Sequence, residues 1–417
     1  MANVPFNDQM MVVKFGGSSI ADSDKISHAA KLVADKAKDG KKIIVIISAI
    51  GKTTDELVKL ANGSASKATP KQMDEVLAMG ERTSCRVFNV ALASFGINSD
   101  FLDVDDEDWP IITDASHGSA NIVLELTKER LANSVSRKME NLDVLVIPGF
   151  IGRSTDGHVT TIGRGGSDAT TYVVADALNI RDVILVSDVS GIMSADPKVV
   201  KNPKKIERID VSQLVGLADS GVKFMHKKAL GYKPKDIDVK IINNTSNSLD
   251  ESGTMITGGV LDIEVDIISK KEAGSITIVG NGITENPGVM SQILGVLHKL
   301  NVPLYGMSAD QGSLVMYLDQ GGVERAVAEL HNIVVANKET LAIARRTGLS
   351  VLRINGIGLQ ETPGSISRVA SILRANGINI YGQYTVMSQI FLIVLFGDEH
   401  NAKKLIEKEL LGDDYEK

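Results

Sequence analysis

Short runs of apolar residues, rich in valine and isoleucine, alternate with amphipathic helical patterns over the first two thirds of the chain. A strand that is apolar at every position is buried on both faces, and helices that alternate with such strands pack on both faces of a parallel sheet. The pattern therefore predicts an α/β fold in which a mostly parallel sheet is sandwiched by helices. We expect strands at 10–15, 41–48, 142–150 and 181–189, and helices at 22–40, 71–95 and 167–179.

Segments rich in glycine or hydroxyl residues stand where four of these strands end. They read KFGGSS (14–19), ISAIGKTT (47–54), PGFIG (148–152) and VSDVSG (186–191). The carboxyl ends of parallel strands meet at one edge of a sheet, and the ligands of such sheets bind beyond that edge. We therefore expect the four segments to contribute to one site.

Two glycine-rich segments have the composition of an anion site. In KFGGSS, Lys14 closes a buried strand, and two glycines lead into a helix start whose N–H groups suit a phosphate. In TTIGRGGSDATT (160–171), Ser167 opens a helix and Arg164 offers a forked donor pair for a carboxylate. Asp168 is either a helix cap or a group that orients Lys14 or a metal. The chain has no GxxxxGK[ST] motif, and a plain tight turn would also explain two glycines after a strand.

The composition argues against several classes of protein. Aromatic residues make up 4% of the chain and the formal net charge is −7, which disfavours a sequence-independent nucleic-acid binder. The single cysteine, Cys85, rules out an internal disulfide framework and fits a reducing compartment. The N-terminal segment does not have the pattern of a signal peptide, and the longest strongly apolar run, 43–50, is too short to span a bilayer. We expect a cytoplasmic protein with no nucleic-acid and no membrane partner.

The last third of the chain repeats itself. ENPGVMSQILGVLHKLNVPLYG and ETPGSISRVASILRANGINIYG align at a shift of 76 residues, so that Pro287-Gly288 matches Pro363-Gly364. Each copy is typical of a strand, a Pro-Gly turn, a helix with one apolar face and a second strand. The duplication predicts two small α+β domains side by side, with the boundary to the first domain in the polar stretch 243–275.

Six segments together resemble the aspartate kinases, members of the amino acid kinase superfamily, in order and in spacing. They are KFGGSS, SAIGKTTDEL, MGERTS, PGFIG, TTIGRGGSDATT and SDVSGIMSADPK, and the resemblance extends over residues 11–258. The duplicated tail resembles the paired ACT regulatory domains of the same enzymes. The resemblance implies an amino acid kinase catalytic domain at 1–262 and two ferredoxin-like ACT domains at 263–345 and 346–417.

The resemblance also implies an activity. Aspartate kinases transfer the γ-phosphoryl group of ATP, used with Mg²⁺, to the β-carboxylate of L-aspartate, which gives 4-phospho-L-aspartate and ADP. This is the first step of lysine, threonine and methionine biosynthesis. A carboxylate is already a nucleophile at neutral pH, so positioning and charge neutralisation suffice for the transfer.

Matched residue by residue, the resemblance implies three sets of site residues. The catalytic set is Lys14, Asp168 and Lys223. The ATP-binding set is Lys14, Gly16, Gly17, Ser18, Ser187, Asp188, Met193, Asp196, Lys198 and Lys223. The aspartate-binding set is Ser48, Thr53, Thr54, Glu81, Arg164, Gly166 and Ser167. In this set Glu81 pairs the amino group and Arg164 takes a carboxylate, although the helical pattern alone would make Glu81 an exposed residue.

Three positions depart from the family pattern. Met193 stands where the family has an aromatic residue, Lys198 replaces an arginine, and KFMHKK (223–228) lacks the proline that follows the histidine in the family. Lysine does not reproduce the planar guanidinium of arginine. These departures bear on nucleotide affinity or base selectivity and leave catalysis in place.

A duplicated small domain is unnecessary for this chemistry, so we expect it to sense an effector. Its Pro-Gly turns precede helices, whose first N–H groups can take the carboxylate of an amino acid. The expected effector residues are Asn286, Pro287, Gly288, Pro363 and Gly364. The resemblance implies lysine or threonine as the effector and a homodimer formed through the ACT domains, or a higher oligomer.

Two alternatives stay open at this point. One is a kinase of the same fold that acts on another acid, such as glutamate, or on a nucleoside monophosphate. The other is a catalytically weak sensor whose ACT pair binds amino acids. For the tail by itself, a role in dimerisation alone also stays open. Retention of Lys14, Ser167, Asp168 and Lys223 argues against the sensor.

Overall fold

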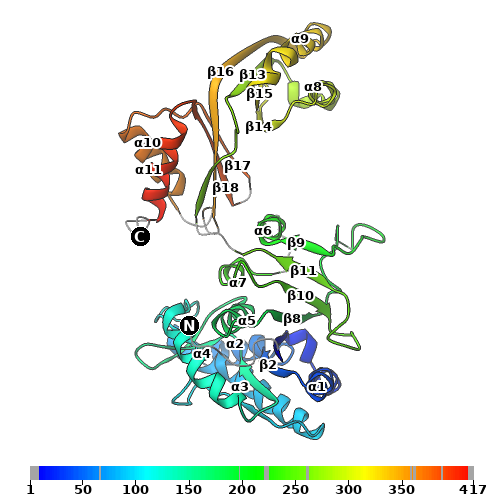
Figure 1. Ribbon diagram of the computed structural model, residues 1–417, viewed down its shortest axis with the longest axis vertical. Coiled ribbons are helices and arrows are strands. Elements are labelled where there is room, and N and C mark those ends of the chain that lie inside the picture. Colours follow the sequence, from blue (N-terminus) through cyan, green and yellow to red (C-terminus); the bar gives the residue numbers. More distant parts are fainter. Residues whose placement is uncertain are drawn as a thin grey trace. The chain divides into compact units, whose positions relative to one another are not determined.

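The computed structural model describes residues 9–64, 67–196, 198–219, 225–259, 263–356, 359, 363–386 and 388–411. The chain divides into two compact units, Met1–Val260 and Leu261–Lys417, which are described separately (Figure 1). Among the described residues, no helix is both long enough and apolar enough to cross a membrane.

The first unit is built on an eight-stranded sheet with the order β3-β5-β2-β1-β8-β10-β11-β9. Its parallel strands are β3 (Ser99–Phe101), β5 (Val144–Pro148), β2 (Lys42–Ile47), β1 (Met10–Phe15), β8 (Asp182–Ser187) and β10 (Val239–Asn243). β11 (Thr254–Thr257) is antiparallel to β10, and β9 (Arg208–Asp210) is parallel to β11. The mostly parallel sheet predicted from the apolar runs is confirmed.

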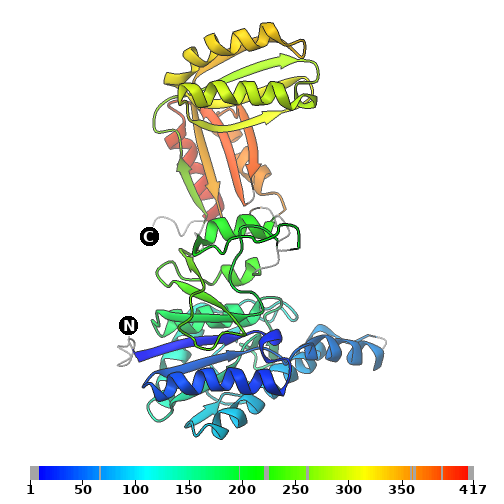
Figure 2. The same cartoon turned by 90° about the vertical axis from the view of Figure 1, so that its right-hand side faces the viewer.

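Helices cover both faces of this sheet, which is why its central strands are apolar at nearly every position. Val13 and Phe15 of β1 pack in one core with α1 (Ser23–Lys38) and α3 (Pro70–Ser94). Alternate residues of a strand face opposite sides. Lys14 therefore points to the other side, where α5 (Gly166–Ala177) packs beside α4 (Leu124–Met139). Figure 2 shows α1, in dark blue, lying along the sheet.

Capping residues determine where the long helices begin. Asp22 accepts a hydrogen bond from Lys25 N at 2.9 Å and caps α1. Thr69 and Gln72 form a reciprocal capping box at the start of α3. Such side chains satisfy N–H groups that the first turn of a helix leaves unpaired. Every strand and helix predicted for the first unit is found, with small differences at the ends.

A second, small sheet carries the glycine-rich segment 160–171. It has the order β4-β6-β7, with β4 (Ile112–Thr113), β6 (Ile151–Ser154) and β7 (Val159–Thr161). β7 leads through the turn at 162–165 into α5, and Ile162 N donates to Phe150 O at 2.9 Å. The hairpin formed by the antiparallel strands β6 and β7 places the segment 160–171 beside the end of β5. The remaining elements of the unit are η2 (Gly17–Ile20), α2 (Thr53–Ser64), α6 (Val211–Asp219) and α7 (Lys227–Leu230).

The second unit contains the two predicted α+β copies around a seven-stranded sheet. The first copy comprises β13 (Ala273–Gly280), η3 (Ile283–Glu285), α8 (Pro287–Leu300), β14 (Leu304–Ala309), β15 (Ser313–Asp319) and α9 (Gln320–Ala336). The second comprises α10 (Ser365–Ala375), β17 (Gly382–Val386), β18 (Gln389–Leu395) and α11 (Glu399–Leu411). Within each copy the two helices lie side by side, as Figure 2 shows for α8 and α9.

The two copies share one long strand, β16 (Thr340–Asn355). Its first half pairs with β13 and its second half with β18. β12 (Glu264–Ile267) pairs with the second half, and Val265 packs in the core of the second copy with Leu352. The domain boundaries 1–262, 263–345 and 346–417 stay predictions. The packing adds that β12, which they assign to the first copy, belongs to the core of the second.

Candidate active site

Lys14 and Asp168 meet at the carboxyl end of the central strand. Lys14 is close to the end of β1, Asp168 is in the first turn of α5, and Lys14 Nζ lies 2.6 Å from Asp168 Oδ1. The two side chains are 14% and 17% exposed. A carboxylate that orients a lysine was one of the two interpretations of Asp168, and this geometry favours it over a helix cap alone.

The turn after β1 is held tightly against its neighbours. Gly16 N donates to Val186 O, at the end of β8, at 3.3 Å. A Cβ on Gly17 would lie 2.8 Å from Ala49 O, so a larger residue would push the two loops apart. The segments that follow β1, β2 and β8 therefore lie together at one edge of the sheet.

Ser48 and Ser167 connect the end of β2 to the start of α5. Ser48 Oγ donates to Ser167 Oγ at 3.0 Å. Gly149 packs against the same serine, because a Cβ on Gly149 would lie 2.6 Å from Ser167 Cβ. The segment after β5 thus joins the same edge, and the expectation that four strand ends share one rim agrees with these contacts.

Glu81 is buried, contrary to what its helical pattern alone indicated. It is 4% exposed, and its Oε1 accepts a hydrogen bond from Ala49 N at 3.1 Å. Its Oε2 is buried with no hydrogen-bond partner among the described residues. Burial raises the pKa of Glu81 to about 8, and the hydrogen bond from Ala49 N opposes this shift. A buried carboxyl oxygen without a partner, beside a loop of the site, suits a cationic group of a ligand.

The other residues predicted near Glu81 are Thr53 and Thr54, at the start of α2. Thr53 Oγ1 donates to Ile50 O at 2.6 Å and so stabilises the turn that precedes the helix. Both threonines are half-buried. A Cβ on Gly80, the neighbour of Glu81, would lie 3.9 Å from Thr53 Cγ2, which places α2 and α3 in contact here.

Arg164 is exposed in the turn between β7 and α5. Its neighbours Gly163 and Gly165 have φ of 85° and 79°, which glycine adopts without steric cost. Gly166 is buried against Phe150 and begins the helix. Arg164 makes no hydrogen bond or ion pair with another residue that the structure describes, so its guanidinium is available to a ligand.

Ser187 and Asp188 follow β8, next to the turn after β1. Ser187 Oγ donates to Asp188 Oδ1 at 3.3 Å, and Asp188 is exposed. Asn244, which follows β10, donates its N–H to Ser187 O at 2.6 Å and its side-chain amide to Ser18 O at 3.5 Å. Ser18 and Ser187 therefore lie close to each other at this edge.

The remaining residues predicted for the nucleotide form a separate turn. Lys198 N donates to Asp196 Oδ1 at 2.8 Å, and Met193 forms a bridge with Lys205. Among the described residues, no hydrogen bond or ion pair joins this turn to β1. Lys223 lies outside the described residues, and its role stays a prediction.

Asp74 was not singled out from the sequence, yet it anchors a neighbouring loop. It is fully buried on α3 and accepts hydrogen bonds from His117 Nδ1 at 2.7 Å, Gly118 N at 3.1 Å and Thr161 Oγ1 at 2.5 Å. Together these bonds hold the loop after β4 against β7. Helical spacing is the sequence signal that could have indicated the burial of Asp74 and Glu81. Both fall on one buried stripe of α3, formed by Asp74, Ala78, Glu81 and Cys85.

In the second unit, the two predicted effector turns differ. Asn286 Oδ1 accepts from Gly288 N at 3.0 Å, so a side chain caps α8. Gly364 has φ of 88°, and no side-chain hydrogen bond caps α10. Pro363 and Gly364 line a cavity of about 360 Å³ together with Thr385. The turn of the second copy is therefore the more open of the two.

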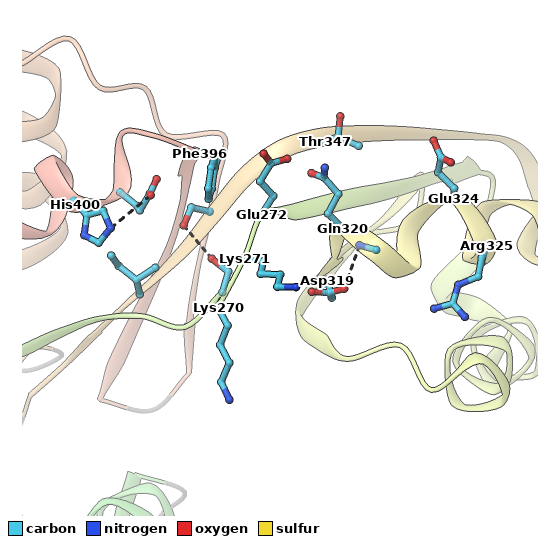
Figure 3. Close-up of a pocket in the computed structure, with 15 residues that line it drawn as sticks. Lys270, Lys271, Glu272, Asp319, Gln320, Glu324, Arg325, Thr347, Phe396 and His400 are labelled. Carbon is cyan, nitrogen blue, oxygen red and sulfur yellow. Dashed lines mark hydrogen bonds and ion pairs between the residues drawn. The ribbon is translucent and has the colours of Figure 1, made fainter.

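A larger cavity, of about 1040 Å³, is lined by residues of both copies (Figure 3). Its ionisable residues are Lys270, Lys271, Arg325 and His400 together with Glu272, Asp319, Glu324 and Glu399. None of the predicted effector residues is among those that line it. The mixture of signs shows no preference for an anion or a cation.

Comparison with known proteins identifies the family to which this fold belongs. The model of the amino acid kinase family matches residues 9–243. The aspartokinase of Mycolicibacterium smegmatis is 30% identical over 300 residues, which cover 70% of this chain and 69% of that protein. The aspartokinase of Mycobacterium tuberculosis (strain ATCC 25618 / H37Rv) is 28% identical over 415 residues, covering 95% of this chain and 94% of that protein.

Solved structures share the fold. Aspartate kinase from Synechocystis has a TM-score of 0.78 at 22% identity, covering 96% of this chain and 69% of that chain. E. coli aspartokinase III in complex with aspartate and ADP has a TM-score of 0.54 at 20% identity, covering 97% and 100%. The protein described here belongs to the amino acid kinase family and, within it, to the aspartokinases.

Proposed function

We propose that the protein is an aspartate kinase, which transfers the γ-phosphoryl group of ATP to the β-carboxylate of L-aspartate and forms 4-phospho-L-aspartate and ADP. The observation that supports the proposal is that one edge of the sheet gathers the segments that bear three candidate groups. They are the paired ammonium of Lys14, the unpaired guanidinium of Arg164 and the buried carboxyl of Glu81. A nucleotide together with an amino acid uses all three groups.

On the aspartate side, Arg164 takes a carboxylate of the substrate through two parallel hydrogen bonds. Glu81 pairs with the substrate ammonium, which supplies the partner that its Oε2 lacks. The remaining residues shape the pocket around the reacting carboxylate: Ser48, Thr53, Thr54, Gly166 and Ser167.

On the phosphate side, Lys14 neutralises a phosphate oxygen while Asp168 holds the ammonium in place. The backbone of Gly16, Gly17 and Ser18 approaches the phosphates closely because two of these residues lack a Cβ. The proposal assigns Lys223 as a second cation at the phosphates. The nucleoside side consists of Ser187, Asp188, Met193, Asp196 and Lys198.

The transfer needs no general base, because the attacking β-carboxylate is already ionised at neutral pH. Catalysis therefore consists of bringing two anions into line and neutralising the charge between them. The protein contributes the ammonium of Lys14, which Asp168 holds in position before the substrates bind, and a fixed charge is more effective than a mobile charge in water.

We also propose that ATP is used with Mg²⁺. No group of three or more His, Cys, Asp or Glu side chains within the described part of the chain could hold a metal ion by itself. Mg²⁺ in kinases binds through substrate phosphates, one or two carboxylates and several waters. The carboxylate of Asp168, which lies beside Lys14, fits this mode. When bound, Mg²⁺ neutralises charge on the phosphate oxygens.

The second unit is proposed to sense an amino-acid end product, lysine or threonine. E. coli aspartokinase III, a relative in fold, has been solved with lysine and aspartate. The cavity at Pro363 and Gly364 lies at the start of α10, where backbone N–H groups favour a carboxylate. Strands β14 and β17 stand at the two ends of the strand order among the described residues, and strands at the end of a sheet can pair with a second copy of the chain, which supports a homodimer.

Measurement of ADP release tests the function directly. Aspartate, glutamate and a nucleoside monophosphate serve as acceptors, each with and without lysine and threonine, and hydroxylamine traps the acyl phosphate as a hydroxamate. Release with aspartate, accompanied by the hydroxamate, supports the proposal. Release with another acceptor alone assigns a different kinase of the same fold. No release from a folded protein whose melting temperature responds to amino acids assigns a sensor.

A further inference from the structure

Lys228, on α7, inserts its ammonium between two segments that are distant in sequence. Lys228 Nζ donates to Ser119 O at 2.9 Å, Ala120 O at 2.9 Å and Ile162 O at 2.8 Å, and lies 3.1 Å from Ser119 Oγ. An ammonium has three protons to donate. All of them are directed to backbone carbonyls, so this lysine joins the loop after β4 to the end of the β7 hairpin.

These carbonyls belong to the base of the turn that carries Arg164. Ile162 is two residues before Arg164, and Ala120 N donates to Thr161 O at 2.9 Å. A Cβ on Gly163 would lie 3.2 Å from Gly118 O, so the loop and the turn are in direct contact. The position of Arg164 therefore depends on how this loop is held.

α7 also covers the turn itself. A Cβ on Gly165 would lie 2.6 Å from His226 Cβ and 3.2 Å from Ala229 Cβ. On the other side, the buried Asp74 holds the same loop through His117 and Gly118. The turn is thus enclosed between α7 and the loop, and Lys228 is the residue that connects the two.

We propose that Lys228 is a positioning residue for the aspartate substrate, which acts by holding the turn that carries Arg164. The proposal rests on the function proposed above. Arg164 has no side-chain partner among the described residues, so its direction is set by the backbone of its turn. Removal of the Lys228 ammonium takes a donor from three carbonyls and loosens the turn, whereas another long cationic side chain can preserve the connection.

The test compares Lys228→Met with Lys228→Arg. We expect Lys228→Met to raise the aspartate KM by about tenfold or more, because a displaced guanidinium loses part of its two-point contact with the substrate carboxylate. The ATP KM should change much less, because among the described residues Lys228 contacts neither Lys14 nor the turn after β1. Lys228→Arg restores most of the aspartate affinity.

Lys42→Met is the matched control. Lys42 Nζ also donates to three backbone carbonyls, those of Met139, Glu140 and Leu142, but it lies at the start of β2, at the opposite edge of the sheet. This variant likewise loses lysine–carbonyl contacts, without touching the Arg164 turn. We expect it to change stability and to leave both KM values unaltered.

Hydrogen exchange at the amides of residues 118–120 and 162–166 provides a readout that does not need activity. Faster exchange there in Lys228→Met, with no such change in Lys42→Met, supports the proposal when the aspartate KM rises as well. Unchanged exchange, or equal increases in the two KM values, overturns it. A wild-type protein that releases no ADP with aspartate contradicts the proposed function instead, and the exchange data still show whether Lys228 holds the turn.

Discussion

Lys14 Nζ lies 2.6 Å from Asp168 Oδ1, and the strand and helix that carry these residues, β1 and α5, pack against each other. The carboxylate therefore restrains the ammonium at the edge of the sheet before a nucleotide arrives. Charges fixed in this way lose little energy to reorganisation when the phosphoryl group moves, which is why they have large effects on rate.

Replacement of Lys14 by methionine removes this fixed cation. We expect Lys14→Met to lower kcat by about a hundredfold, equivalent to about 3 kcal/mol of barrier. The coupled ADP assay measures the effect. Lys36→Met is the control, because it also breaks a lysine–aspartate pair. Lys36, on α1, has its Nζ 2.7 Å from Asp250 Oδ2. A kcat close to that of the wild type in folded Lys14→Met protein would falsify the assignment of KFGGSS to the phosphates.

Arg164→Lys tests the substrate grip. A lysine keeps the charge but cannot form two parallel hydrogen bonds, so the aspartate KM should rise by about thirtyfold, from the loss of about 2 kcal/mol. The ATP KM should not change. Arg181→Lys, at an exposed position at the start of β8, is the control for the substitution itself. If both KM values of Arg164→Lys rise together, the arginine serves the nucleotide or the fold.

The buried carboxyl of Glu81 makes the stability of the first unit depend on pH. Its pKa of about 8 in the folded protein lies above the ordinary value of 4.5, so folding stability is fully present below pH 4.5 and falls as the pH rises towards 8. Relative to Glu81→Gln, the wild type should lose about 1.4 kcal/mol of unfolding free energy per pH unit in this window.

The single tryptophan, Trp109, is buried in the first unit and reports this unfolding through its fluorescence. Glu75→Gln, at an exposed position on the same helix, is the matched control for the loss of a carboxyl group. Wild-type and Glu81→Gln curves that run parallel from pH 5 to pH 8 would contradict the raised pKa.

Binding of aspartate should release a proton from Glu81. At pH 7 the pKa of about 8 keeps the carboxyl mostly protonated, and the substrate ammonium stabilises the ionised form. Calorimetric titrations in two buffers of different ionisation enthalpy should show release of up to about one proton per aspartate, and none in Glu81→Gln. Equal apparent binding enthalpies in both buffers would mean that no proton is released. That result would contradict a contact between Glu81 and the substrate ammonium.

Gly364→Asp should desensitise the enzyme to its amino-acid effector. The new carboxylate stands where the effector carboxylate is proposed to bind, and among the described residues a Cβ on Gly364 meets no atom within 4 Å, so the cost of the substitution is the positive φ alone. Asp and Asn both tolerate the positive φ of this position better than other residues. Gly364→Asn is therefore the control of equal shape without charge. Inhibition curves of the two variants that coincide would place the effector elsewhere.

The main architecture of the first unit could be predicted because short stretches of sequence indicate its strands, helices and turns. The strand 10–15 and its neighbour 42–47 are apolar at almost every position, and glycines mark the turns that follow them. Burial on both faces of a parallel sheet leaves no other arrangement for such runs. The positions of Lys14 and Ser167 at one edge follow from this topology.

The support of the site could not be predicted in the same way. Asp74 and His117 are 43 residues apart, and Lys228 and Ser119 are 109 residues apart. These contacts depend on where the β6–β7 hairpin and α7 pack. Residues close together in sequence do not indicate that packing. Glu81 needed the family resemblance, because a glutamate beside an arginine on a helix is ordinarily solvated.

Strands β12 and β16 make the second unit nested. β12 precedes the first copy in the chain, yet it pairs with residues that follow that copy, so the first copy is an insertion into the second. A truncation at residue 345 leaves β12 without its partner strand, and a fragment that starts at 346 lacks β12 altogether. The 16 residues of β16 contribute to both cores. The duplicated copies therefore share a strand, and we expect a cut between them to destabilise both.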